Sequence, residues 1–122
     1  MLSFDQVGDL LDEICEKFPP AFFAELNGGV CLLPEAKPDP EAGPELYTMG
    51  EYCHDSMGRY INIYYGSFAA LAGNLNTAEL AEELYATLSH EFTHHMESLA
   101  GERGLERKDE AFMEEFWSER DG

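Results

Sequence analysis

Apolar residues recur at helical spacing in the first part of the chain. Between positions 4 and 18 they are three or four residues apart, the spacing that places side chains on one side of a helix. Ser3 followed by Gln6 is a capping-box pattern. The pattern predicts a first helix from Ser3 to about Lys17, ended by Pro19 and Pro20. A short second helix is expected over residues 21–26, ended by the glycines at 28 and 29.

The middle of the chain consists of short β-favouring runs separated by turn-forming residues. Residues 30–33 predict a short strand, and the proline-rich residues 34–44 predict a surface loop. Residues 46–53 and 59–65 predict a hairpin whose loop is residues 54–58. Residues 67–72 predict one or two helical turns.

The second half of the chain is predicted to be mostly helical. Asn76 followed by Glu79 is another N-terminal capping signal, and a long helix is expected over residues 77–100. Gly101 and Gly104 are expected to end it, and residues 108–120 resume helical spacing. We therefore expect a single α+β domain over residues 1–122. Its small, mostly antiparallel sheet would pack on the N-terminal and long helices, and a C-terminal helix would follow.

Charge and composition restrict the function classes. The 122 residues include 25 acidic and 7 basic ones, a net charge of -18, which disfavours nucleic acid and anionic membranes as partners. No apolar run is long enough to span a bilayer, and the first residues lack a signal-peptide pattern, so we expect a cytoplasmic protein. Cys15, Cys31 and Cys53 form no CxxC motif, which argues against disulfides and a cysteine zinc knuckle. We expect each to be a small buried hydrophobe.

The long predicted helix contains an HExxH motif at residues 90–94. His90 and His94 lie one turn apart and can converge on one zinc ion, while Glu91 can act as general base. On a helical wheel the apolar residues share one side: Leu80, Ala81, Leu84, Tyr85, Leu88, Phe92, Met96 and Leu99. Both histidines of the motif face away from that side, so they are either metal ligands or two solvated side chains.

Other titratable residues near the motif have simpler interpretations. His95 falls on the apolar side of the wheel, so we expect it to be packed or to support a ligand. His54 is expected to be a solvated turn residue. Glu97 shares the ligand side but lies about 10 Å along the helix axis from His90, a distance better suited to orienting a ligand imidazole than to binding the metal.

Together with residues 59–64 (RYINIY), the segment 87–95 (TLSHEFTHH) resembles the small bacterial zincin-like metallopeptidase family, the mini-zincins. The resemblance implies a peptidase with one Zn²⁺ per chain, held by His90 and His94, with Glu91 as general base. It also implies that a strand above the active-site helix pairs with an extended peptide or protein substrate.

The third zinc ligand departs from the family pattern. The family continues HExxHxxGxxD, whereas this chain has Glu97 and Ala100 at the Gly and Asp positions. A carboxylate beyond the glycine break is therefore expected, and Asp109 is favoured because it begins the last predicted helix. The alternatives that stay open are Glu102, Glu106, Glu97, Glu110 and Glu114.

Two other functions compete with the peptidase. The absent Asp at position 100 is also consistent with a catalytically silent zincin-like domain that binds or regulates a peptide or protein. The charge alone would fit an acidic interaction protein that binds a basic partner. Two further features stay open. An oxyanion could accept a hydrogen bond from Tyr60, Tyr64, Tyr65 or His54. Homodimerisation is possible, because it would enlarge the small core of a chain of this length.

Overall fold

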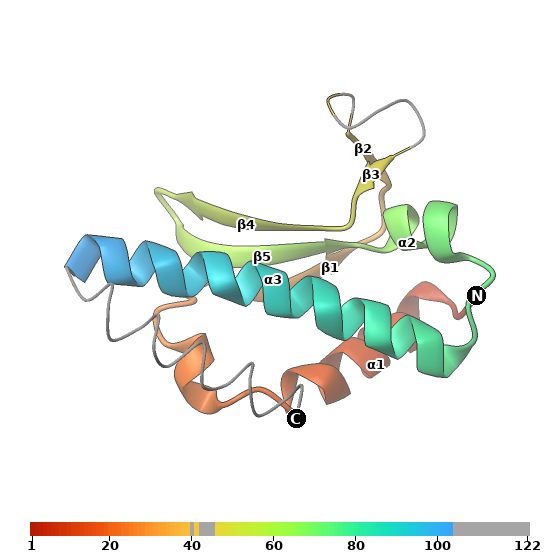
Figure 1. The fold of residues 1–122 in the computed structure, drawn as a ribbon, viewed down its shortest axis with the longest axis horizontal. Helices are drawn as coiled ribbons and strands as arrows, with labels where there is room; N and C mark the ends of the chain where they lie inside the picture. Colours follow the sequence, from red (N-terminus) through yellow and green to blue (C-terminus); the bar gives the residue numbers. More distant parts are fainter. Residues whose placement is uncertain (40, 42–45, 104–122) are drawn as a thin grey trace.

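Helices and strands follow one another in an α+β order, which confirms the predicted class. A computed structural model describes residues 1–39, 41 and 46–103 (Figure 1). Its elements are α1 (Phe4–Cys15), the 3₁₀ turn η1 (Pro20–Phe23), β1 (Gly29–Leu33), β2 (Lys37–Pro38), β3 (Tyr47–Thr48), β4 (Gly50–Asp55), β5 (Gly58–Tyr64), α2 (Tyr65–Ala72) and α3 (Thr77–Arg103).

The main sheet has three strands in the order β1-β5-β4. β4 and β5 form the predicted antiparallel hairpin, with Gly50 opposite Ile63. β1 runs parallel to β5, with Val30 opposite Ile61, so the sheet is mixed at this edge. A separate two-stranded antiparallel sheet joins β2 to β3. β4 is thus an edge strand of the main sheet.

The helices α1 and α3 lie on one face of the main sheet, as Figure 1 shows. The core between these layers contains Ile61 and Ile63 of β5, with side chains of both helices. Phe92 of α3 lies among three other phenylalanine rings, with ring centroids 4.9 Å from Phe18, 5.5 Å from Phe22 and 5.0 Å from Phe23. This packing fixes the orientation of the helix that carries HExxH, because Phe92 belongs to the motif.

The predicted helix starts are confirmed. The Ser3 hydroxyl accepts from the backbone of Gln6, and the Gln6 side chain accepts from the backbone of Ser3. Asn76 and Glu79 make the same reciprocal pair at the start of α3. Each pair satisfies two backbone N–H groups that have no partner within the helix.

Several predicted boundaries were wrong. α3 continues through Gly101, because nothing forces this exposed glycine out of helical geometry. β4 includes His54 and Asp55, so the hairpin loop is shorter than predicted. The proline-rich segment is not loop throughout, since it contains β2. The residues at 21–26 form only the 3₁₀ turn η1.

Some predictions concern residues outside the described ranges. The C-terminal helix at residues 108–120 and the carboxylates Glu106, Asp109, Glu110 and Glu114 lie there, as does Gly104. Among the described helices, none combines the length and apolar character that crossing a bilayer requires.

Candidate functional site

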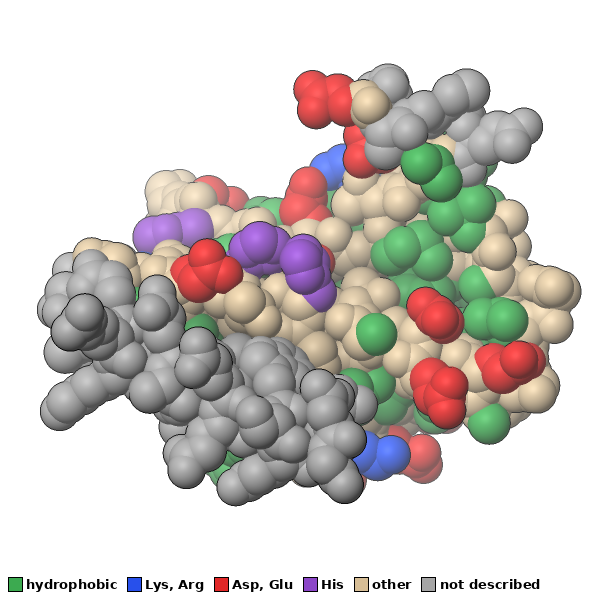
Figure 2. Space-filling view, in the orientation of Figure 1, with side chains coloured by type: hydrophobic (Ala, Val, Ile, Leu, Met, Phe, Trp, Pro, Cys, Tyr) green, Lys and Arg blue, Asp and Glu red, His purple; other side chains and the backbone are tan. Residues whose placement is uncertain are grey.

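His90 and His94 project from the exposed side of α3, as the helical wheel predicted. Their Nε2 atoms lie 3.1 Å apart. Two imidazoles on one tetrahedral zinc, with Zn–N bonds of about 2.0–2.1 Å, would place these atoms about 3.3 Å apart. Figure 2 shows histidine side chains on the surface along α3, with acidic side chains near them. The spacing fits a pair of ligands for one metal ion.

Glu91 occupies a different environment from the two histidines. Its side chain is buried, with 6% exposure. Burial raises the pKa of the Glu91 carboxyl, while the neighbouring His90 and His94 and a hydrogen bond from the Tyr52 backbone N–H oppose the rise. A carboxylate with a raised pKa is a better proton acceptor, which is the property a general base needs.

The edge strand β4 lies directly over the motif. The backbone N–H of Tyr64 donates to Met49 at 2.9 Å, so Met49 and Tyr64 are a hydrogen-bonded pair. Because such pairs alternate in an antiparallel ladder, the backbone groups of Gly50 and Tyr52 point away from β5, toward the free edge. The hydrogen bond from Tyr52 to Glu91 uses one of these edge groups.

Gly50 allows this close approach of strand and helix. A Cβ atom there would lie 2.7 Å from Cγ2 of Thr87 and 3.4 Å from Cγ of Glu91. A contact as short as the first requires Thr87 or the strand to shift, so a side chain at position 50 would crowd β4 against α3. The sequence predicts a strand at Gly50, but no local pattern indicates this contact.

A cleft runs between the edge of β4 and α3. One part, of about 670 Å³, is lined by Thr48, Gly50, Glu51, Tyr52, His90, Glu91, His94, Glu97 and Ser98. An adjoining part, of about 410 Å³, shares four of these residues and adds Asp39, Met49, Ala86 and Thr87. The HExxH side chains therefore lie in an open groove beside the free edge of β4.

His95 is a structural neighbour of the site. It is fully buried, and its Nε2 lies 2.8 Å from the carbonyl oxygen of Ala24. A carbonyl can only accept, so Nε2 carries the proton and Nδ1 accepts from the Tyr52 hydroxyl at 2.8 Å. Burial lowers the pKa of His95, which keeps the ring neutral. The prediction of a packed histidine is confirmed, and Tyr52 is a site residue that no sequence pattern indicates.

Three of the candidate oxyanion donors are already engaged in hydrogen bonds. Tyr60 donates to Asp55, Tyr64 donates to Glu51, and Tyr65 donates to the carbonyl of Leu2. None of the three lines the groove. His54 is exposed near the end of β4, as expected.

The three cysteines are free thiols, as predicted, but each is only partly buried. Burial and the nearby Asp12 raise the pKa of the Cys15 thiol to about 11. Burial and Glu51 also raise the pKa of the Cys53 thiol. Both are therefore poor nucleophiles near neutral pH, because the thiolate is the reactive form.

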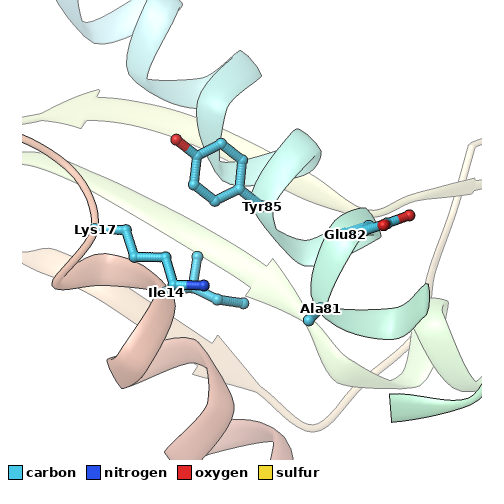
Figure 3. A pocket seen from close by; sticks show the side chains of 5 residues that line it. All are labelled: Ile14, Lys17, Ala81, Glu82 and Tyr85. Atoms are coloured by element: carbon cyan, nitrogen blue, oxygen red, sulfur yellow. The ribbon is translucent and has the colours of Figure 1, made fainter. Parts of the chain in front are cut away.

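Another hollow, of about 390 Å³, lies between α1 and the first turns of α3. Figure 3 shows the side chains that line it: Ile14, Lys17, Ala81, Glu82 and Tyr85. Zinc in proteins is bound by histidine, cysteine and carboxylate side chains, and the lining of this hollow includes only one of these types, the carboxylate of Glu82. Of these two sites, the β4–α3 cleft is the one that contains His90, Glu91 and His94.

Within residues 1–39, 41 and 46–103, no three His, Cys, Asp or Glu side chains are close enough to hold one metal ion. Glu97 lines the same cleft as His90 and His94 but does not complete such a group. Asp109, the favoured third ligand, lies outside the described residues, as do Glu106, Glu110 and Glu114.

Comparison with known proteins gives a relative among the solved structures. No protein-family model and no curated protein matches the chain. Among solved structures, a conserved hypothetical protein from Thermus thermophilus is 34% identical, with a TM-score of 0.72. The match covers 82% of this chain and 99% of that one. The likeness therefore extends over nearly the whole of the relative and includes sequence as well as fold.

Proposed function

The chain belongs to the family of the conserved hypothetical protein from Thermus thermophilus, and we propose that it is a zinc-dependent metallopeptidase. The observation that carries the proposal is the arrangement of the motif. Two exposed imidazoles converge to 3.1 Å beside a buried carboxylate, in a groove beneath a free strand edge.

His90 and His94 would hold the zinc ion through their Nε2 atoms. Zinc would supply a Lewis acid and lower the pKa of water at the site. The two nitrogens face each other, and both side chains line the groove where a substrate carbonyl would lie.

Glu91 would act on the attacking water. Its carboxylate would take a proton from the water and later give it to the leaving amine nitrogen. The buried position raises its pKa, which strengthens it as a base. The carboxylate has two oxygens, so one can accept from the Tyr52 N–H while the other would take the proton from the water.

The edge of β4 would orient the peptide. A strand added to this edge would find the outward backbone groups of Gly50, next to Glu91. Pairing of this kind fixes the direction and register of a peptide through its main chain, so it accepts many side chains.

The third ligand would come from beyond Gly101. Two histidines alone leave more open positions than catalytic zinc sites usually have. Asp109 stays the first choice, with Glu102, Glu106, Glu110 and Glu114 as alternatives.

The test is metal content by elemental analysis after zinc equilibration and removal of excess. We expect about one equivalent in the wild type and none in His90→Ala. Loss in Asp109→Ala would identify the third ligand. A peptidase screen would follow, with Glu91→Gln as a variant that keeps zinc but lacks the base. A wild type without stoichiometric zinc would refute the proposal.

A catalytically silent peptide-binding domain is the second candidate. It is favoured by the lack of a three-ligand group among the described residues. It predicts peptide binding in the β4–α3 cleft that persists in metal chelator and in His90→Ala. An acidic interaction protein would instead be indifferent to substitutions at His90 and Glu91.

A further inference from the structure

Carboxylates line the β4–α3 cleft on both sides of His90 and Glu91. Glu97 lines the part of the cleft that lies toward the end of α3. Asp39 lines the opposite part, with Ala86 and Thr87. Lys and Arg are absent from the described lining of both parts. A peptide along the edge of β4 would therefore pass one carboxylate on each side of its central residues.

Lys37, the basic residue beside the cleft residue Glu51, forms an ion pair with it. Lys37 pairs with Glu51 at 2.5 Å, and its ammonium lies 5.5 Å from the centre of the Tyr64 ring. The hydrogen bond with Glu51 raises the pKa of Lys37 and lowers the pKa of Glu51, so both stay charged. At the other end, Ser98 accepts a hydrogen bond from Nε of the buried Arg59 at 3.4 Å. Glu97 lines the groove beside Ser98, is exposed and forms no ion pair with a described residue.

We propose that the cleft selects peptides with lysine or arginine on either side of the residues that lie over Glu91. The inference rests on the proposed function, because it names the substrate class of that same groove. Asp39 and Glu97 are the specificity-determining carboxylates.

Net charge provides a competing explanation that the test must exclude. A chain with a net charge of -18 attracts every cation, wherever its carboxylates lie. A local effect requires that a carboxylate in the cleft matter more than an equal one elsewhere. Glu82 supplies this control, because it lines the separate hollow in Figure 3.

The experiment measures binding of three labelled peptides by fluorescence anisotropy. They share one length and one central apolar sequence and are flanked by lysine, glutamine or glutamate. The protein is the zinc-equilibrated full chain carrying Glu91→Gln, so that no peptide is cut during the measurement. Glu97→Gln, Asp39→Asn and Glu82→Gln are each added to this background, and each removes one negative charge.

We expect the lysine-flanked peptide to bind about tenfold tighter than the glutamine-flanked one. Glu97→Gln and Asp39→Asn should each weaken lysine-peptide binding about two- to fivefold and leave the glutamine peptide unchanged. Glu82→Gln should have little effect. Equal binding of the lysine and glutamine peptides, or equal losses in Glu82→Gln and Glu97→Gln, would overturn the inference.

Zinc content of the same samples tests the proposed function separately. Stoichiometric zinc without a preference for lysine would refute only the substrate class. A preference for lysine that depends on Glu97, in protein that holds no zinc, would keep the peptide specificity and remove the peptidase.

Discussion

Glu91 combines a charged group with an almost fully buried position. The HExxH spacing predicts its role as a base, because that role follows from the helix period. Its burial could not be predicted from the helix alone, since it depends on the approach of β4 through Gly50. The same burial makes the carboxylate costly to the folded state.

Glu91→Gln is expected to raise thermal stability while abolishing hydrolysis. The folded-state pKa of Glu91 is raised by burial, so the stability it contributes is complete at low pH and is lost as pH rises above 4.5 and through that folded-state value. Glutamine keeps an oxygen for the Tyr52 N–H and has no charge to bury. Scanning calorimetry of metal-free protein at pH 7 should show a Tm higher by a few degrees. A lower Tm would contradict this assignment.

His95 should make stability fall on the acid side of neutrality. Its folded-state pKa is lowered by burial, so the unfolded chain binds the proton more readily. The contribution is complete above the ordinary value of 6.5 and is lost as pH falls below it. Urea unfolding of metal-free wild type and His95→Gln between pH 7.5 and 5.5 checks this. The wild-type free energy should fall more steeply, and parallel slopes would refute the prediction.

At the scale of elements, Gly50 and Gly101 should respond in opposite ways to an added side chain. A Cβ at Gly50 would lie 2.7 Å from Thr87, whereas at Gly101 it would meet no atom within 4 Å. Gly50→Ala should destabilise the protein by about 1–3 kcal/mol by separating β4 from α3. Gly101→Ala should stabilise α3 by up to about 1 kcal/mol. Denaturant unfolding of both variants measures the contrast, and similar effects would exclude this account of the β4–α3 contact.

Elements with a strong local signal were predictable from the sequence. The capping pairs at Ser3 and Asn76 set both helix starts. The end of α3 was not predictable, because glycine permits a break without requiring one. The parallel pairing of β1 with β5 depends on how the β4–β5 hairpin folds back onto β1, and no local sequence pattern indicates this.

At the scale of the whole molecule, the net charge of -18 should destabilise the compact state by self-repulsion. Added sodium chloride shortens the screening length from about 10 Å at 0.1 M to about 3 Å at 1 M. The Tm of metal-free protein is therefore expected to rise with salt over this range. A Tm that stays constant or falls would show that the acidic residues are compensated within the fold.

The candidate site was predictable as far as one helix extends. His90, Glu91 and His94 share a helix, so their spacing determines their relative positions. The cleft is also lined by Gly50, Tyr52 and Ser98. Their place in it depends on how the sheet packs on α3, which the spacing within one helix does not determine. A third ligand from a distant segment requires tertiary information of the same kind.

The hydrogen bond from the Tyr52 N–H to Glu91 makes this amide a natural reporter for the cleft. Amides on the free edge of a sheet ordinarily exchange their hydrogen with solvent quickly, while bonded and buried ones exchange slowly. The Tyr52 amide should therefore be protected from deuterium uptake in the resting protein. A peptide that pairs with the edge of β4 should also protect the amide of Gly50, which points away from β5 in the resting protein.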